Sequence, residues 1–311
     1  LGLVSTVPPG FSPGSDIANM GLLGYEPSKY YTGRGPIEAT SLGIDIPKDK
    51  IVFRCNFVFI KDSTMQSFNA DHITTKESDQ IIKELNNYFD SSEAMFYTGV
   101  SYRHILLLDQ KFLNLTCSPP HDITDKNIKD FLPQGQNAQA LMAFMQKCQS
   151  ILDNSNINKK RIQNNLAPAN SIWPWGQGRE MKLPSFYDKF GLEGGVVTAV
   201  DLLKGLGQLA GLETPDIPGA TGYLDTNYQE KVKKALEILK RKDFVYLHIE
   251  APDEAGHLGD INLKIKAIED FDKNVVGPIL DYQRKNNNIH VMVLPDHPTP
   301  CSLKTHTCDP V

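Results

Sequence analysis

The sequence has few cysteines and no paired cysteine motif. Its five cysteines show no CxxC pair and no regular spacing. A structural metal site or a disulfide framework usually depends on such spacing, so neither is indicated. We expect most of the cysteines to be core or loop residues in a reducing compartment, which predicts a cytoplasmic protein. Cys301 and Cys308 flank His306, and metal ligation by them is an open alternative.

The sequence also lacks long apolar runs and a strong charge excess. No stretch approaches the uninterrupted apolar length of a membrane span. The 32 basic and 37 acidic residues leave a net charge of −5, which argues against a general nucleic-acid or membrane-surface binder. With 311 residues, 40% of them hydrophobic, the chain has ample material for a core and, by its length, for two domains.

An initiating methionine and a visible signal peptide are absent as well. The chain begins at Leu1 in the middle of a motif and stops at Val311, soon after His306. We expect residues of the natural protein to precede Leu1 and others to follow Val311. The absence of a targeting segment therefore excludes little.

Two apolar runs, each followed by metal-ligand residue types, carry the strongest signal. Residues 244–249 have the pattern of a buried strand and run into a proline-containing segment, predicted to be a loop, with Asp253 and His257. Residues 291–294 are a second strand candidate, followed by Asp296 and His297, with His306 farther along the same loop. Ligands of open α/β sheets bind outside the carboxyl ends of strands, so these five side chains are expected to meet.

Mixed carboxylate and imidazole ligands suit Zn, Mn, Fe or Co better than an all-oxygen calcium cage. Each residue alone has a plainer interpretation, as a turn residue or a satisfied surface group. Five of them after two strand ends favour a metal site.

A serine near the start of the chain is a candidate nucleophile. Ser15 follows a Pro/Gly-rich turn and stands where a helix is predicted to begin. It could be a plain N-cap, or a nucleophile held where backbone N–H groups favour an anion such as phosphate.

The order of elements indicates an α/β protein with an insertion. Strand, helix, strand, helix and strand alternate from residue 194 to residue 296, which predicts a parallel sheet. The helices are expected at 201–210 and 228–241, between the first two strands, and at 263–280, between the last two. Residues 48–181 contain strands 51–60 and 102–108 and helices 77–88 and 137–154 without extending that rhythm. We therefore expect a discontinuous domain, 1–47 with 182–311, and an inserted α+β domain, 48–181.

The chain resembles a known family along nearly its whole length. The resemblance rests on eight segments, which occur in the same order as in the family: PPGFSPGSDIANMGLLGYEP, YYTGRGPIEA, FRCNF, YRH, IWPWGQG, APDEAGH, LPDHPTP and KTHT. They are similar to motifs of the archaeal-type cofactor-independent phosphoglycerate mutases of the alkaline phosphatase superfamily. The resemblance implies an alkaline-phosphatase-like three-layer domain with a mostly parallel sheet, plus the inserted domain.

The resemblance also implies a reaction and its residues. Members interconvert 3-phosphoglycerate and 2-phosphoglycerate in glycolysis and gluconeogenesis through a phosphoserine, with two divalent metals (Mn, Mg, Zn or Co) and no 2,3-bisphosphoglycerate. Ser15 matches the phosphorylated nucleophile. One metal site matches Asp253, His257 and His306, and the second matches Asp296 and His297 with Ser15. The family's further aspartate, in an Asp-Gly strand end, has no counterpart after Leu1, and we expect it to lie upstream of this sequence.

The inserted domain is expected to bind the substrate carboxylate through arginines, whose planar fork suits bidentate contacts. Arg54 and Arg103 are the first candidates, and an exposed, solvated arginine is the alternative for each. The other substrate candidates are Arg34, Arg161, Arg179 and, for phosphate, Lys204.

Two alternatives to this function stay open. A metal-dependent phosphatase or another phosphomutase of the same superfamily would share the metal ligands, and a non-catalytic scaffold is the alternative from another class. The sequence leaves open an assembly of identical copies.

Overall fold

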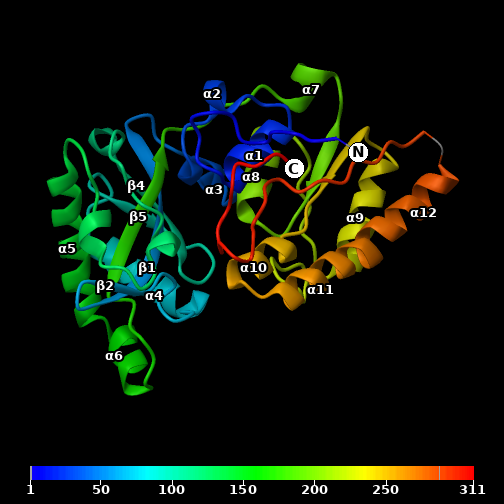
Figure 1. The fold of residues 1–311 in the computed structure, drawn as a ribbon. Coiled ribbons are helices and arrows are strands. Elements are labelled where there is room, and N and C mark those ends of the chain that lie inside the picture. The colour runs from blue at the N-terminus through cyan, green and yellow to red at the C-terminus, as the bar shows by residue number, and fades with distance from the viewer. Residues whose placement is uncertain (1, 287) are drawn as a thin grey trace. The chain divides into compact units, whose positions relative to one another are not determined.

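The computed structural model describes residues 2–286 and 288–311, which form a mixed α/β structure (Figure 1). The chain divides into two compact units. Unit 1 comprises Leu1–Tyr31 and Lys182–Val311, and unit 2 comprises Thr32–Met181. Over the described ranges, no helix is both long and apolar enough to cross a membrane.

Unit 2 is built on a five-stranded antiparallel sheet whose central strand is β1 (Lys50–Lys61). This strand pairs with β4 (Arg103–Asp109) on one side and with β5 (Ser171–Gly178) on the other. Two short strands complete the sheet: β2 (Thr64–Ser67) pairs with β1, and β3 (Met95–Tyr97) pairs with β4. Residues 50–58 of β1 are buried whichever way they point, so both faces of the sheet are covered. The predicted strands 51–60 and 102–108 are confirmed.

Helices α4 (Thr75–Tyr88) and α5 (Ala138–Asn154) pack beside β3 and β5. Leu141, Phe144, Met145 and Cys148, which recur at helical spacing in α5, are all buried, and the two helix predictions are confirmed. Unit 2 also contains α6 (Asn156–Gln163) and 3₁₀ turns at Gln110–Phe112, Pro120–Ile123 and Ile128–Phe131.

Helix α3 (Arg34–Ser41) packs on β1 and β5 and therefore belongs to unit 2. Its approach is close because two glycines face the sheet. A Cβ on Gly33 would lie 2.2 Å from the carbonyl oxygen of Gln177, and one on Gly35 would lie 2.7 Å from that of Val52. The boundary between the units thus falls at residues 31/32, whereas the sequence placed it at 47/48; the second boundary falls at 181/182.

Unit 1 contains two parallel strands, β6 (Gly194–Val197) and β7 (Phe244–Leu247). Helices α8 (Asp201–Leu209) and α9 (Tyr228–Leu239) connect them, as a crossover between parallel strands requires. The predicted strand–helix–strand order is confirmed for this segment. The N-terminal part adds α1 (Ser15–Leu22), which packs on α8, and α2 (Pro27–Tyr30); α7 (Phe186–Phe190) precedes β6.

The segment after β7 is helical, so the predicted loop at Asp253 and His257 is wrong. It forms α10 (Ala251–Leu258), with Pro252 in the first turn, where a missing N–H costs no intrahelical hydrogen bond. The helix predicted at 263–280 is longer and interrupted. It consists of α11 (Ile261–Phe271), a π-helical turn (Asp272–Val276) and α12 (Gly277–Lys285).

The predicted buried strand at residues 291–294 is also wrong. These residues have no strand assignment, and Met292 is 80% exposed. Among the described residues, the sheet of unit 1 contains only β6 and β7. An apolar run forms a strand only where a neighbour pairs with its backbone. No strand pairs with this run among the described residues, and Met292 and Val293 stay exposed while Val291 and Leu294 are half-buried.

Candidate active site

Helix α10 places two ligand residues on one face. Asp253 and His257 are four residues apart, so their side chains are neighbours on the helix surface. His257 Nε2 lies 3.2 Å from Asp253 Oδ2. The other ring nitrogen, Nδ1, lies 3.0 Å from the carbonyl oxygen of Lys304. A carbonyl only accepts, so His257 carries its proton on Nδ1 when neutral and directs the Nε2 lone pair toward Asp253.

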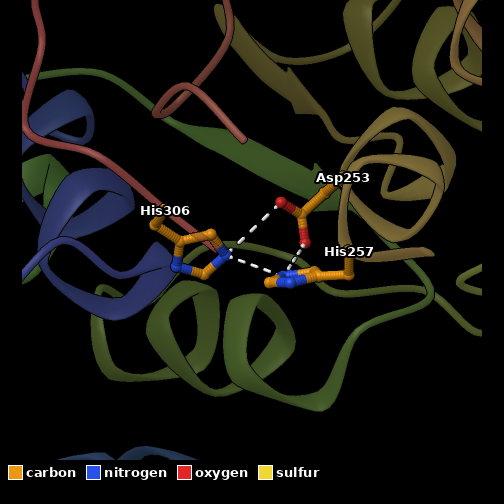
Figure 2. Close-up of side chains that lie close together, drawn as sticks. All are labelled: Asp253, His257 and His306. Atoms are coloured by element: carbon orange, nitrogen blue, oxygen red, sulfur yellow. Dashed lines mark hydrogen bonds and ion pairs between the residues drawn. The ribbon is translucent and has the colours of Figure 1, made fainter. Parts of the chain in front are cut away.

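The segment before the C-terminus adds a third side chain. His306 Nε2 lies 3.4 Å from Asp253 Oδ1 and 3.0 Å from His257 Nε2. Figure 2 shows the three side chains pointing toward one another. Their ligand atoms lie within 4.8 Å of one another, and within residues 2–286 and 288–311 no other group of three His, Cys, Asp or Glu residues does so. Cys301 and Cys308 do not belong to this group.

The charges of this group fit a metal cation. Burial would raise the pKa of Asp253, but hydrogen bonds with His257 and His306 hold it well below its usual range. The hydrogen bond with Asp253 raises the pKa of His257 to about 9. Two Nε2 atoms and a carboxylate oxygen therefore converge where positive charge is favoured. Zn²⁺, Mn²⁺ and similar ions bind such sets of imidazole and carboxylate ligands. A further hydrogen bond, such as that of His257 to the Lys304 carbonyl, commonly orients a ligating imidazole.

A second cluster contains Ser15, Asp296 and His297. Helix α1 begins at Ser15, with Gly14 as its N-cap, so the Ser15 side chain does not cap the helix. Its Oγ lies 2.9 Å from His297 Nε2, which in turn lies 3.4 Å from Asp296 Oδ2. His297 is 4% exposed, and burial lowers its pKa, which favours the neutral ring that can bind a cation.

The two clusters adjoin one another within unit 1. The ring centroids of His297 and His306 are 3.9 Å apart. Thr299 contacts both sides: its hydroxyl donates a short hydrogen bond to Asp253 Oδ1 and lies 3.3 Å from His297 Nδ1. Residues from α1, α10 and the C-terminal segment thus form one continuous site.

Two buried residues of this site, Asn19 and Thr299, were not singled out by the sequence. The Asn19 amide nitrogen donates to the Ser15 carbonyl (2.8 Å) and to Asp296 Oδ2 (2.7 Å), and its oxygen accepts from the Tyr246 hydroxyl (2.5 Å). Asn19 lies one helical turn after Ser15, and Thr299 lies two residues after His297. For Asn19 that spacing was the available signal, since residues four apart lie on the same face of a helix. Thr299 lies in a segment without helix or strand, where spacing gives no such signal.

Unit 2 contains a separate cluster of arginines around Glu38. Arg34 Nε and Arg54 Nη1 lie 2.9 Å and 3.0 Å from Glu38 Oε1. Burial would raise the pKa of Glu38, but Arg54, Arg34 and Arg103 hold it below its ordinary value. Three guanidinium groups thus act on one carboxylate, and the cluster keeps an excess of positive charge.

Arg54 is the most buried member of this cluster, at 4% exposure. Its guanidinium lies over the Trp175 ring, 4.7 Å from the centroid, and burial lowers its pKa to about 10. Its Nε is buried without a hydrogen-bond partner among the described residues. A buried donor without a partner is costly, so this atom is a candidate contact for an anion.

The other basic candidates lie in different surroundings. Arg161 is 3% exposed, and its guanidinium donates to both carboxylate oxygens of Glu77 and to the carbonyls of Ala70, Asp71 and Ala167. Arg179 is exposed and reaches Gln110 at 3.5 Å. Lys204, in unit 1, pairs with Asp216 at 2.7 Å. The structure thus brings together Arg34, Arg54 and Arg103, and Arg161 already has acceptors for each of its nitrogens.

Comparisons with known proteins agree with the resemblance. Residues 1–158 match the family model described as 2,3-bisphosphoglycerate-independent phosphoglycerate mutase. A protein of that name from Methanothrix thermoacetophila is 48% identical over 311 residues, which are 100% of this chain and 79% of that protein.

Two solved structures are similar as well. A protein from Pyrococcus horikoshii has a TM-score of 0.75 at 29% identity, covering 99% of this chain and 74% of that one. The cofactor-independent phosphoglycerate mutase from Thermoplasma acidophilum has a TM-score of 0.53 at 28% identity, covering 91% of this chain and 73% of that one. The sequence motifs, the matching family model and the full-length relative lead to one conclusion: this chain belongs to the archaeal-type 2,3-bisphosphoglycerate-independent phosphoglycerate mutases.

Proposed function

We propose that this chain interconverts 3-phosphoglycerate and 2-phosphoglycerate by passing the phosphoryl group through Ser15. The enzyme is an isomerase, its substrate is a small molecule, and its family name excludes a requirement for 2,3-bisphosphoglycerate. The contact between Ser15 Oγ and His297 Nε2, at 2.9 Å beside Asp296, is the observation that carries the proposal.

The surroundings of Ser15 suit a nucleophile. A serine hydroxyl reacts poorly at its free pKa and needs a neighbour that removes or stabilises its proton. Ser15 Oγ lies 2.9 Å from His297 Nε2, so a cation held by His297 would lie next to the serine oxygen and would stabilise its deprotonated form. The N-terminus of α1 presents backbone N–H groups next to Ser15, and these favour a phosphoryl group carried on its oxygen.

Two divalent metals are part of the proposal. Asp253, His257 and His306 would hold one, and Asp296, His297 and Ser15 would hold the second. Divalent ions there would lower the pKa of the Ser15 hydroxyl and neutralise phosphate oxygens. Asp253 and His257 lie on α10, which follows strand β7. Ligand residues after a sheet strand agree with an alkaline-phosphatase-like layout, and we include that layout in the proposal.

The arginine cluster of unit 2 is the proposed binding group for the substrate carboxylate. Arg54 is held in place by Glu38 and Trp175, and its Nε has no partner among the described residues. Arg34 and Arg103 add the positive charge that Glu38 does not balance. A preorganised fork with excess charge suits a carboxylate better than a solvated lysine would.

A cytoplasmic location is also proposed. All five cysteines are free, and Cys55 and Cys148 are buried. Free thiols persist where the compartment is reducing.

The decisive assay is turnover of 3-phosphoglycerate without 2,3-bisphosphoglycerate, after EDTA and after manganese is added back. We expect metal-restored formation of 2-phosphoglycerate in the unsubstituted chain, and a loss of at least about 10⁴-fold in Ser15→Ala because the nucleophile is gone. Ser28→Ala is the matched control, since Ser28 is exposed and bonds only to Glu26 among the described contacts. Release of free phosphate in place of 2-phosphoglycerate would instead identify a phosphatase.

A further inference from the structure

Asn19 holds the oxygen of Asp296 that faces the rest of the second cluster. Asn19 is 0% exposed on α1, and its Nδ2 donates to Asp296 Oδ2 at 2.7 Å. The same oxygen lies 3.4 Å from His297 Nε2. The other oxygen, Oδ1, accepts the backbone N–H of His297 at 3.0 Å. Among the described contacts, no other amide or hydroxyl side chain donates to this carboxylate, so its orientation depends on Asn19 and one backbone N–H.

Three contacts fix the orientation of the Asn19 amide. An amide side chain has two N–H donors and one acceptor oxygen. Nδ2 donates to the Ser15 carbonyl (2.8 Å) and to Asp296, and Oδ1 accepts from the Tyr246 hydroxyl (2.5 Å). If the amide were turned over, its oxygen would face a carbonyl and a carboxylate, and neither of these can donate. The amide therefore keeps the orientation that presents an N–H to Asp296.

Tyr246 supplies its hydroxyl from a strand. It lies in β7 and pairs with Val196 of β6, so the sheet holds its backbone in place. The Asn19 amide thus joins three parts of unit 1, which are helix α1, strand β7 and the segment that contains Asp296. Carboxylates that bind metal ions are commonly held by outer hydrogen bonds of this kind, and these bonds contribute to the affinity of the site.

We propose that Asn19, oriented by Tyr246, is a positioning residue that holds Asp296 Oδ2 beside His297 Nε2 for a divalent cation. This role rests on the proposed function in one respect, which is the metal ion that Asp296 would bind. Asn19 acts through Asp296 and not by touching the ion or the substrate. Tyr246 acts one step farther away, through Asn19, so its removal should have the smaller effect.

The test is manganese titration of the metal-free full-length protein, in which two ions are expected to bind. Asp296→Asn identifies the ion that depends on Asp296. Loss of an outer hydrogen bond typically weakens metal binding about 10- to 100-fold, so Asn19→Leu, similar in shape but without donors, should weaken that ion by this factor. Tyr246→Phe should weaken it by about 3- to 10-fold, the value of one neutral hydrogen bond. The ion bound by Asp253 should keep its affinity in both variants.

Each variant has a control for the loss of a buried polar group. Asn158→Leu removes an amide that is 2% exposed and hydrogen-bonded to backbone groups of unit 2. Tyr25→Phe removes a hydroxyl of unit 1 that donates to the Pro184 carbonyl at 2.9 Å. Both controls should lower the free energy of unfolding and leave the two manganese affinities unchanged. If Asn19→Leu does not fold, Tyr246→Phe and its control still decide the question.

Because Tyr246 acts through Asn19, the double variant should bind the Asp296-dependent ion as weakly as Asn19→Leu alone. If Asn19→Leu and Tyr246→Phe bind this ion as tightly as their controls, the proposal is overturned and the proposed function is untouched. A protein without any Asp296-dependent ion would overturn both the proposal and the second metal of the proposed function. Absence of mutase turnover in a protein that shows the expected losses of affinity would count against the proposed function alone.

Discussion

The ionisable clusters of the two units differ in how their charges are matched. In unit 1, the Asp253 carboxylate lies 3.2 Å and 3.4 Å from two imidazole nitrogens, and an imidazole nitrogen can carry either a proton or a metal ion. In unit 2, Glu38 lies among three guanidinium groups, which are cations at neutral pH and do not bind metal ions. The first cluster can exchange protons for a cation, and the second keeps a positive surplus for an anion. Different ligand chemistries therefore belong to different units.

The largest loss of metal binding and turnover is expected on substitution of Asp253, the carboxylate that contacts both His257 and His306. Asp253→Asn keeps the shape of the side chain and removes its charge, so the cluster should no longer bind the proposed metal ion. Because a metal ion contributes several kcal/mol to such reactions, turnover should fall by roughly 10³-fold. Manganese titration and the mutase assay measure the two effects. Asp216→Asn is the control, since Asp216 is an exposed carboxylate of the same unit; equal behaviour of the two variants would refute the ligand assignment.

Arg54 and Arg161 form a matched pair inside unit 2, since both are buried but only Arg54 has a guanidinium nitrogen without a hydrogen-bond partner among the described residues. Arg54→Lys keeps a charge but loses the fork, and kcat/KM for 3-phosphoglycerate should fall by about 30- to 100-fold, the value of a charged hydrogen bond.

Arg161→Lys removes hydrogen bonds to Glu77 and to three backbone carbonyls. It should lower the free energy of unfolding by about 3 kcal/mol while the folded protein keeps its kcat/KM. Steady-state kinetics and urea unfolding of both variants would separate these roles, and the reverse pattern would assign substrate binding to Arg161.

The smallest expected effect is a pH dependence of metal affinity. The pKa of His257 is raised to about 9 in the metal-free protein, above the ordinary value near 6.5. The stabilisation from its protonated form is complete below about pH 6.5 and is lost as the pH rises through about 9. A metal must displace this proton, so manganese affinity should rise by up to about tenfold per pH unit between pH 7 and 9. Titrations at pH 7 and 8.5 test this, and an affinity that does not change would show that His257 binds no metal.

Local patterns predicted much of the fold because periodicity reports which face of an element is buried. Helices α5 and α9 bury the face that apolar spacing indicates, whereas strands β1 and β4 are apolar runs that are buried on both faces. The errors have a different cause. The residues around Pro252 were assigned to a loop because proline breaks helix interiors, yet it is accommodated in a first turn. Residues 291–294 have strand propensity, but a sheet needs a paired neighbour, which propensity does not reveal.

The candidate site could be predicted in part for a similar reason. Asp and His after predicted strands, and Ser15 at a predicted helix start, identified side chains whose atoms meet, and the ligand and nucleophile roles assigned to them stay predictions. Sequence could not separate Arg54 from Arg161, because the difference lies in which acceptors the fold places around each guanidinium. It also passed over Asn19 and Thr299, whose importance comes from hydrogen bonds to residues far along the chain.

The most direct test of the central claim is to trap the phosphoryl group on Ser15. The metal-loaded full-length chain would be mixed with 3-phosphoglycerate, quenched in acid within milliseconds and digested for mass spectrometry. If Ser15 carries the phosphoryl group, phosphate should appear on the peptide that contains Ser15. It should form before 2-phosphoglycerate accumulates and be absent in Ser15→Ala. Formation of 2-phosphoglycerate at the normal rate with no phosphate on Ser15 would contradict it.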